Sequence, residues 1–225
     1  IFFENKDILS ENDGAIQKIR GNSISTIFQE PMTSLNPLHT INKQIEEIIH
    51  THNKISKEDA KKKTAYLLKE VGLEMLAKRQ KIYPYELSGG QRQRVMIAMS
   101  IANNPNVLIA DEPTTALDVT IQMQILNLLS NLQKKLGMTM IFISHDLSVV
   151  KKISDFIYVM KNGSIIENGN TERVFNKPVN DYTKKLISSN SSKKINTFSK
   201  KEEILKVEKL KVWYPIKKGL LRKTV

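Results

Sequence analysis

The sequence contains no cysteine, which excludes a disulfide framework and any metal site built on thiolate ligands. It lacks an apolar stretch of the ~20 residues that a helix needs to cross a bilayer, and no secretory signal pattern is visible. The absence of cysteine fits a reducing compartment. The chain starts with isoleucine rather than methionine, and we expect it to be a fragment. With 225 residues, 40% of them hydrophobic, it can pack one good-sized domain or parts of two.

Acidic residues are scarce near the C-terminus, where residues 177–225 contain 14 Lys and Arg against 4 Asp and Glu. Residues 1–176 contain 21 and 19, so most of the formal net charge of +12 belongs to the tail. A Lys-rich segment of this kind is typical of a solvated linker, with contact to anionic lipid or nucleic acid as alternatives. The distribution of charge therefore argues against a nucleic-acid-binding domain in residues 1–176.

Two short blocks, about twenty residues apart, carry the chemistry. In the first, residues 87–94 (LSGGQRQR), Ser88 can cap a helix and two glycines leave the backbone bare beside it. A helix N-terminus with free N–H groups binds anions, and its dipole favours phosphate. The second, residues 107–113 (VLIADEP), predicts a buried parallel strand with acids at the edge where open α/β sheets bind ligands. Of these two acids, Asp111 and Glu112, one can hold Mg²⁺ beside a nucleotide and its neighbour can orient a water molecule.

In this order and spacing, the two blocks resemble the ATP-binding subunit of ABC transporters. Residues 87–91 are similar to the signature motif of that family, LSGGQ, and residues 107–112 are similar to its Walker B strand with the catalytic glutamate. The resemblance implies an α/β fold with a P-loop NTPase-like core, in which a mostly parallel sheet is flanked by helices, together with an α-helical subdomain. It also implies ATP and Mg²⁺ as cofactors and ATP hydrolysis as the activity.

Two further residues follow predicted strands and match functional loops of the family. Residues 23–28 alternate between polar and apolar side chains and predict a strand, and Gln29 after it matches the Q-loop. The longer stretch 28–37 (FQEPMTSLNP) is similar to the Q-loop of dipeptide and oligopeptide importers. A tandem arrangement, expected below, favours oligopeptide or microcin C-like uptake. Residues 138–143 predict a second buried strand. His145 follows that strand, so it can reach the same crevice as the acids, and it matches the switch histidine that contacts the γ-phosphate.

Two other matches have structural alternatives. Asp118 matches the D-loop of the family, which runs across the dimer seam, but it can equally cap a helix that starts near Thr120. Tyr214 matches the aromatic side chain that stacks on adenine, with Trp213 as the substitute. Core packing is the alternative explanation for both aromatic residues.

The remaining elements are predicted from periodicity and turn residues. Residues 41–79 have apolar side chains at helical spacing, with one helix ending at Gly72, and they belong to the helical subdomain expected at about 38–90. The other predicted elements are a strand or hairpin arm in 1–9, a helix over 10–20 capped by Ser10, a helix over 121–136, a hairpin at 162–163, and short helices at 171–175 and 181–187.

The sequence contains no G-x-x-x-x-G-K-[ST] loop, which would cradle nucleotide phosphates with backbone N–H groups. In the family this loop, Walker A, precedes the Q-loop. We therefore expect a window cut from a tandem protein with two ATPase domains, lacking both Walker A motifs and inactive alone. Residues 1–188 would belong to the first domain, 189–203 would form a linker, and 204–225 would open the second domain with a strand over 204–210.

The resemblance implies ATP hydrolysis that powers the uptake of peptides or peptide-like solutes. Asp111 would bind Mg²⁺ mainly through water, Glu112 would orient or deprotonate the attacking water, and His145 would stabilise the γ-phosphate. Gln29 would reach the metal and the water and link the site to the membrane subunits. Four signature residues would close over ATP held by the second ATPase domain: Ser88, Gly89, Gly90 and Gln91.

The implied partners are transmembrane permease subunits, the second ATPase domain and, indirectly, a substrate-binding protein. The implied location is the cytoplasmic face of the inner membrane, and no nucleic acid is expected. One alternative is a soluble ABC-type ATPase that acts on nucleic acid or ribosomes, which the basic tail permits. Another is a non-catalytic relic, against which the intact Glu112 and His145 argue.

Overall fold

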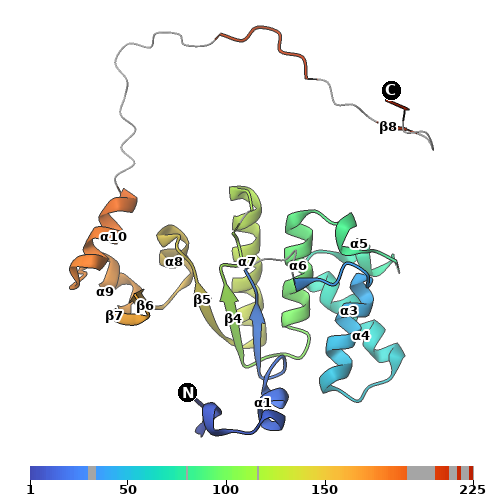
Figure 1. Cartoon of the computed structure of the whole chain (residues 1–225), viewed down its shortest axis with the longest axis horizontal. Coiled ribbons are helices and arrows are strands. Elements are labelled where there is room, and N and C mark those ends of the chain that lie inside the picture. Colours follow the sequence, from blue (N-terminus) through green and yellow to red (C-terminus); the bar gives the residue numbers. More distant parts are fainter. Residues whose placement is uncertain are drawn as a thin grey trace. The chain divides into compact units, whose positions relative to one another are not determined.

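The computed structural model describes residues 1–29, 34–79, 81–115, 117–191, 206–212, 217–218 and 223–224. By the contacts within it, the chain divides into two units, Ile1–Ile187 and Ser188–Val225. Both are drawn in Figure 1. The proposed boundaries of the ATPase domains and of the linker stay a prediction.

A three-stranded parallel sheet lies at the centre of the first unit, in the order β3–β4–β5 (Figure 1). The strands are β3 (Ile24–Ile27), β4 (Val107–Asp111) and β5 (Thr139–Ile143). The register aligns Ile27 with Ala110 and Ala110 with Phe142. Parallel strands need crossover connections, which are helical here. All three carboxyl ends therefore meet at one edge, and the predicted parallel sheet is confirmed.

One face of the sheet packs against two helices, α6 (Gly89–Ser100) and α7 (Val119–Leu136). Helix α7 presents an apolar stripe at positions i, i+4 and i+7. Each fully buried aliphatic side chain of this kind contributes roughly 1.5–3 kcal/mol. The core on this face includes Ile27, Leu108, Ala110, Ile97, Ile125, Leu129 and Leu132.

The opposite face is covered much less, and here the prediction of a second buried strand is wrong. In β5, Ile141 and Ile143 are 50% and 46% exposed, whereas Met140 and Phe142 on the other face pack against the core. Within the described sheet, β5 pairs only with β4. An apolar run predicts a strand suited to burial on both faces, but it does not reveal whether another segment covers the second face.

Helices α3 (Ile41–His52), α4 (Lys57–Glu70) and α5 (Glu74–Ala77) pack against one another, and α3 and α4 also pack against α6 (Figure 1). The first two helices begin at the side-chain caps Thr40 and Ser56, and Thr and Ser are residue types that favour this position. Gly72, with φ of +72°, follows α4 and ends it. The helical character predicted for residues 41–79 is confirmed for the described part of that stretch.

At the N-terminus, β1 (Phe2–Phe3) and β2 (Lys6–Asp7) form an antiparallel hairpin, and a short 3-10 helix, Ile8–Ser10, precedes α1 (Asp13–Ile19). The prediction that Ser10 caps this helix is wrong. The cap is Asn12, whose Oδ1 accepts from the Ala15 N–H at 2.9 Å. The Ser10 hydroxyl is already engaged, since it donates to the Asp7 carbonyl at 2.8 Å.

The first unit continues with α8 (Leu147–Ile153) and an antiparallel hairpin of β6 (Phe156–Lys161) and β7 (Ser164–Asn170). Asn162 and Gly163 both have positive φ, +49° and +77°, as tight hairpins of this kind require, so the predicted turn is confirmed. The short helices α9 (Thr171–Asn176) and α10 (Asp181–Ser191) follow, with α10 extending beyond its predicted end.

The second unit contains two short antiparallel strands, β8 (Lys217–Lys218) and β9 (Lys223–Thr224). Residues 206–210 form no strand, so the predicted strand over 204–210 is wrong for its described part. An apolar alternation makes a strand only where a partner strand supplies hydrogen bonds. Tyr214 and Trp213 lie outside the described residues. Among the helices that the structure describes, none is long and apolar enough to cross a membrane.

Candidate functional site

Side chains that follow three different strands meet at the carboxyl edge of the parallel sheet. Gln29 follows β3, Glu112 follows β4, and His145 follows β5. The Gln29 Nε2 donates to Glu112 Oε2 at 3.0 Å, and His145 Nδ1 lies 2.8 Å from Glu112 Oε1. Positions separated by 83 and 33 residues thus meet at one carboxylate, and the catalytic roles expected of them stay a prediction.

The backbone of Glu112 is fixed from two sides. Its φ of +44° is uncommon for a residue other than glycine, and such strain is typical of functional sites. The Glu112 N–H donates to the Ile143 carbonyl at 3.0 Å, which ties the residue to the end of β5. Its carbonyl accepts from the Thr115 N–H at 3.1 Å, and the Thr115 hydroxyl donates to Glu112 Oε2 at 2.9 Å.

Sequence reasoning missed Thr115. A hydroxyl residue three positions after the last acid of the strand was a readable signal, because side chains of this type bond back to neighbouring groups in turns. It is the third donor to the Glu112 carboxylate among the described residues.

Glu112 and His145 each stabilise the charged form of the other. The hydrogen bond from His145, followed by that from Thr115, lowers the pKa of the Glu112 carboxyl, and Glu112 in turn raises the pKa of the His145 imidazole. The pair therefore favours a carboxylate facing an imidazolium. The His145 side chain is 76% exposed, so water screens the attraction strongly. What the arrangement supplies is a carboxylate in a defined orientation, ready to accept a proton once a water molecule replaces one donor.

Asp111 ends β4, one residue before Glu112, and is half-buried. No described residue hydrogen-bonds to its carboxylate, and Gln29 uses its Nε2 for Glu112, which leaves Gln29 Oε1 available. Oxygen ligands of this kind suit Mg²⁺. The described residues contain no group of three or more His, Asp and Glu that could hold a metal. Two oxygen donors nevertheless fit Mg²⁺, which usually takes the rest of its ligands from water and substrate phosphates.

The signature segment begins α6 with a reciprocal cap. Ser88 Oγ accepts from the Gln91 N–H at 3.3 Å, and Gln91 Oε1 accepts from the Ser88 N–H at 2.9 Å. This is a capping box, which the Ser-x-x-Gln spacing could have predicted. The N–H groups of Gly89 and Gly90 have no acceptor in the described part of the chain. These N–H groups remain open, and anion binding at this helix end stays a prediction.

The first turns of α6 and α7 are in close contact. A Cβ atom added to Gly90 would lie 2.8 Å from Ile121 Cγ2, so only glycine fits there without a shift. Asp118 Oδ1 accepts from the Ile121 N–H at 2.9 Å and caps α7. The structural alternative for Asp118 is thus realised, and its role across a dimer seam stays a prediction.

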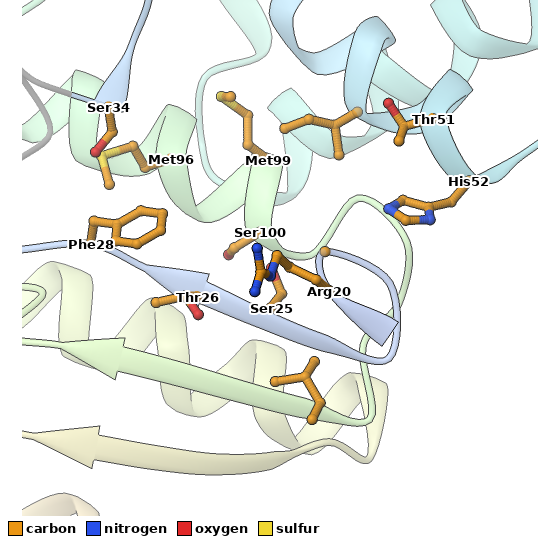
Figure 2. Close-up of a pocket in the computed structure, with 13 residues that line it drawn as sticks. Arg20, Ser25, Thr26, Phe28, Ser34, Thr51, His52, Met96, Met99 and Ser100 are labelled. Atoms are coloured by element: carbon orange, nitrogen blue, oxygen red, sulfur yellow. The ribbon is translucent and has the colours of Figure 1, made fainter. Parts of the chain in front are cut away.

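A groove of about 340 Å³ runs along β3 between α3 and α6 (Figure 2). Phe28 and Met96 line one part of it, Met99 lies farther along, and His52 lies at the α3 side. Arg20 also lines the groove and forms no ion pair with any described residue. The groove is therefore mostly apolar, contains a cation, and reaches the residue directly before Gln29.

Comparison with known proteins now identifies the family. A profile described as ABC transporter matches residues 1–115, about half of the chain. The chain belongs to the ABC transporter family. The ATP-binding cassette MJ0796, in a post-hydrolysis dimer bound to ADP and Pi, is 31% identical, with a TM-score of 0.67 over 76% of this chain and 72% of that chain. This likeness confirms the predicted α/β fold with a P-loop NTPase-like core.

Among ABC transporter relatives, the chain is 50% identical over its whole length to the peptidoglycan transport ATP-binding protein YejF of Agrobacterium fabrum, covering 41% of that protein. It is 52% identical to the oligopeptide transport ATP-binding protein OppD of Bacillus subtilis over 189 residues, which is 84% of this chain and 53% of that protein. The chain thus spans about half or less of the length of these relatives.

Proposed function

We propose that this chain is part of an ATP-hydrolysing subunit of an ABC transporter that powers the uptake of peptides or peptide-like solutes. The observation that carries the proposal is the convergence of Gln29 and His145 on the Glu112 carboxylate, beside an unengaged Asp111. Further support comes from relatives at about 50% identity that are named for peptidoglycan and oligopeptide transport.

In this function Glu112 accepts the proton of the water that attacks the γ-phosphate. His145 supplies positive charge near the phosphate, because its bond to Glu112 favours the imidazolium. Asp111, with the Gln29 oxygen, would hold Mg²⁺, which neutralises the charge that develops on the phosphates. The alternative of a soluble ABC-type ATPase that acts on nucleic acid or ribosomes has less support, since none of the relatives described above is named for such a role.

The open N–H groups of Gly89 and Gly90 suit ATP that is presented by a second ATPase domain. We propose that this domain follows in the same protein and that the basic segment after residue 188 leads to it. The two relatives support this arrangement in different ways. The match to YejF includes the second unit, whereas the match to OppD has a length of 189 residues, close to that of the first unit.

The groove beside β3 is a suitable site for a transmembrane permease subunit. Its lining includes Phe28, which is 59% exposed and directly precedes Gln29. A permease loop with an apolar side chain and a carboxylate would fill the apolar part and pair with Arg20. Movement of such a loop would reach Glu112 through Gln29. We therefore propose a location at the cytoplasmic face of the cell membrane, with a substrate-binding protein as an indirect partner.

The deciding experiment is Glu112→Gln in the complete protein that contains this chain. The amide keeps the size of the side chain but cannot accept the proton, so hydrolysis should fall by roughly 10²–10⁴ while ATP binding persists. Steady-state phosphate release and equilibrium binding of a labelled ATP analogue measure the two quantities. Glu172→Gln, at an exposed acid in α9, is the matched control. Turnover near that of the unmodified protein in Glu112→Gln would contradict the proposal.

The transport part of the proposal needs its own measurement. Cells that produce the complete protein and its permease should accumulate labelled oligopeptides, and Glu112→Gln should stop the uptake. Stimulation of ATP hydrolysis by nucleic acid or ribosomes, with no uptake of peptides, would favour the soluble alternative.

A further inference from the structure

Three side chains donate hydrogen bonds to the Glu112 carboxylate, and they differ in the other roles expected of them during hydrolysis. Gln29 and His145 are expected to turn towards the metal, the water and the γ-phosphate during the reaction. Thr115 has no such task. It is joined to Glu112 by a short turn, which the bond from the Thr115 N–H to the Glu112 carbonyl closes at 3.1 Å. Its hydroxyl is therefore the donor that stays with Glu112 when the other two leave.

We propose that Thr115 is a positioning residue for hydrolysis, whose hydroxyl holds the Glu112 carboxylate in the orientation from which it acts on the attacking water. The inference rests on the proposed function, in which Glu112 is the base. A Glu side chain has several rotatable bonds, and a displacement of about 1 Å at a reacting group can reduce the rate by up to about 10²-fold. One charge-assisted hydrogen bond at 2.9 Å restricts this freedom.

The Thr115 hydroxyl has no evident role in stabilising the fold. Thr115 is exposed, so its hydroxyl is not a buried group in need of a partner. The cap of the following helix is supplied by Asp118, which accepts from the Ile121 N–H. Removal of the hydroxyl should therefore leave the fold and the helix start unchanged and affect the carboxylate alone.

The test uses the complete protein with three variants. Thr115→Val keeps the shape and removes the hydroxyl, and Thr115→Ser keeps the hydroxyl. Thr120→Val makes the same change at another exposed threonine, in the first turn of α7. We expect kcat to fall about tenfold in Thr115→Val, in line with the loss of one hydrogen bond to a charged group, with KM for ATP unchanged. Thr115→Ser and Thr120→Val should stay within about twofold of the unmodified protein.

The double variant Thr115→Val with Glu112→Gln shows whether Thr115 acts through Glu112 or independently of it. If Thr115 acts through Glu112, Thr115→Val adds no further loss to the residual rate of Glu112→Gln. The inference is overturned by a kcat of Thr115→Val within twofold of the unmodified protein, by equal losses in Thr115→Ser or Thr120→Val, or by an additive loss in the double variant.

The same experiment distinguishes this inference from the proposed function. Normal hydrolysis in Glu112→Gln would contradict the proposed function itself. Loss of hydrolysis in Glu112→Gln together with a normal kcat in Thr115→Val would contradict only the role of Thr115. Thermal unfolding of each variant shows whether the substitution has changed the fold.

Discussion

Two places in the first unit offer charged or polar groups to a ligand. They differ in how many of these groups already form hydrogen bonds within the chain. At the edge of the sheet, the Glu112 carboxylate is engaged by three donors from within the chain. At the start of α6, the N–H groups of Gly89 and Gly90 have no acceptor among the described residues. The first place is assembled before any ligand arrives. The second is complete only when an anion is brought to it.

This comparison predicts that the two places respond differently to substitution. At the sheet edge, a substitution that removes one donor leaves two others bound to the Glu112 carboxylate, so only the loss of Glu112 itself should have a large effect. At the start of α6, both the open donors and the close contact with α7 depend on small residues. Substitutions there should therefore have large effects.

Apart from Glu112→Gln, the largest effect is expected for Ser88→Arg in the complete protein. A bulky cation at the cap removes the acceptor for the Gln91 N–H and blocks the approach of a phosphate to the helix end. Hydrolysis of ATP held by the second domain should fall by roughly 10²-fold or more, as for the loss of a donor to a transition-state anion. A photoreactive ATP under trapping conditions, followed by mapping of the labelled domain, measures this.

The first domain should keep its trapped nucleotide in Ser88→Arg, and Ser88→Thr, which retains a capping hydroxyl, is the control. Retention of trapped nucleotide at the second domain, with loss at the first, would mean that the signature acts within its own domain.

A smaller effect is expected for Gly90→Ala. The added methyl group would lie 2.8 Å from Ile121 Cγ2, and such overpacking costs about 1–3 kcal/mol. Thermal unfolding of the 225-residue chain should show a lower Tm. Gly89→Ala is the matched control, because its Cβ would meet Leu117 Cδ2 at an ordinary 3.8 Å.

The contact with Ile121 can be tested directly. In Gly90→Ala combined with Ile121→Ala, the destabilisation should be less than the sum of the two single effects, since the second change removes the atom that clashes. Additive losses would show that the distance between the two helices is set elsewhere.

The smallest effect concerns the ion pair at the sheet edge. Glu112 raises the pKa of His145, so the pair contributes stability that is fully present below the unfolded pKa of His145 and is lost as the pH rises through its folded pKa. Because the pKa of Glu112 is lowered, the contribution also fades as the pH falls through the folded pKa of Glu112. The energy involved is small, because the His145 side chain is 76% exposed.

Titration of the His145 ring by NMR measures the effect. In Glu112→Gln the pKa of His145 should move back towards the ordinary histidine value of 6.5, whereas Glu172→Gln should leave it unchanged. An identical titration curve in Glu112→Gln and the unmodified chain would mean that the two side chains are not paired in solution.

Part of the candidate site could be predicted because it follows from strand order. Gln29, Glu112 and His145 each come directly after a predicted strand or two residues beyond it, and parallel strands end at a common edge. Their meeting therefore required only that the three strands be parallel neighbours, which they are. The chemical roles of these residues stay a prediction.

Other features depended on contacts that no local pattern reveals. Asn12 rather than Ser10 caps α1, because the Ser10 hydroxyl already donates a hydrogen bond to the Asp7 carbonyl. The strand predicted at 204–210 is not formed in its described part, because none of the strands that the structure describes pairs with residues 206–210. The contact of Gly90 with Ile121 joins positions on two different helices.

By itself the sequence determined most of the helices and strands of the first unit, since periodicity, capping residues and turn residues act over a few neighbouring positions. The tertiary structure alone decided which face of the sheet is covered and which donors surround Glu112. The side chains of Ile141 and Phe142 are adjacent and both apolar, yet Ile141 is half-exposed and Phe142 packs against the core. Burial depends on what the rest of the chain brings to each face, and that is a property of distant residues.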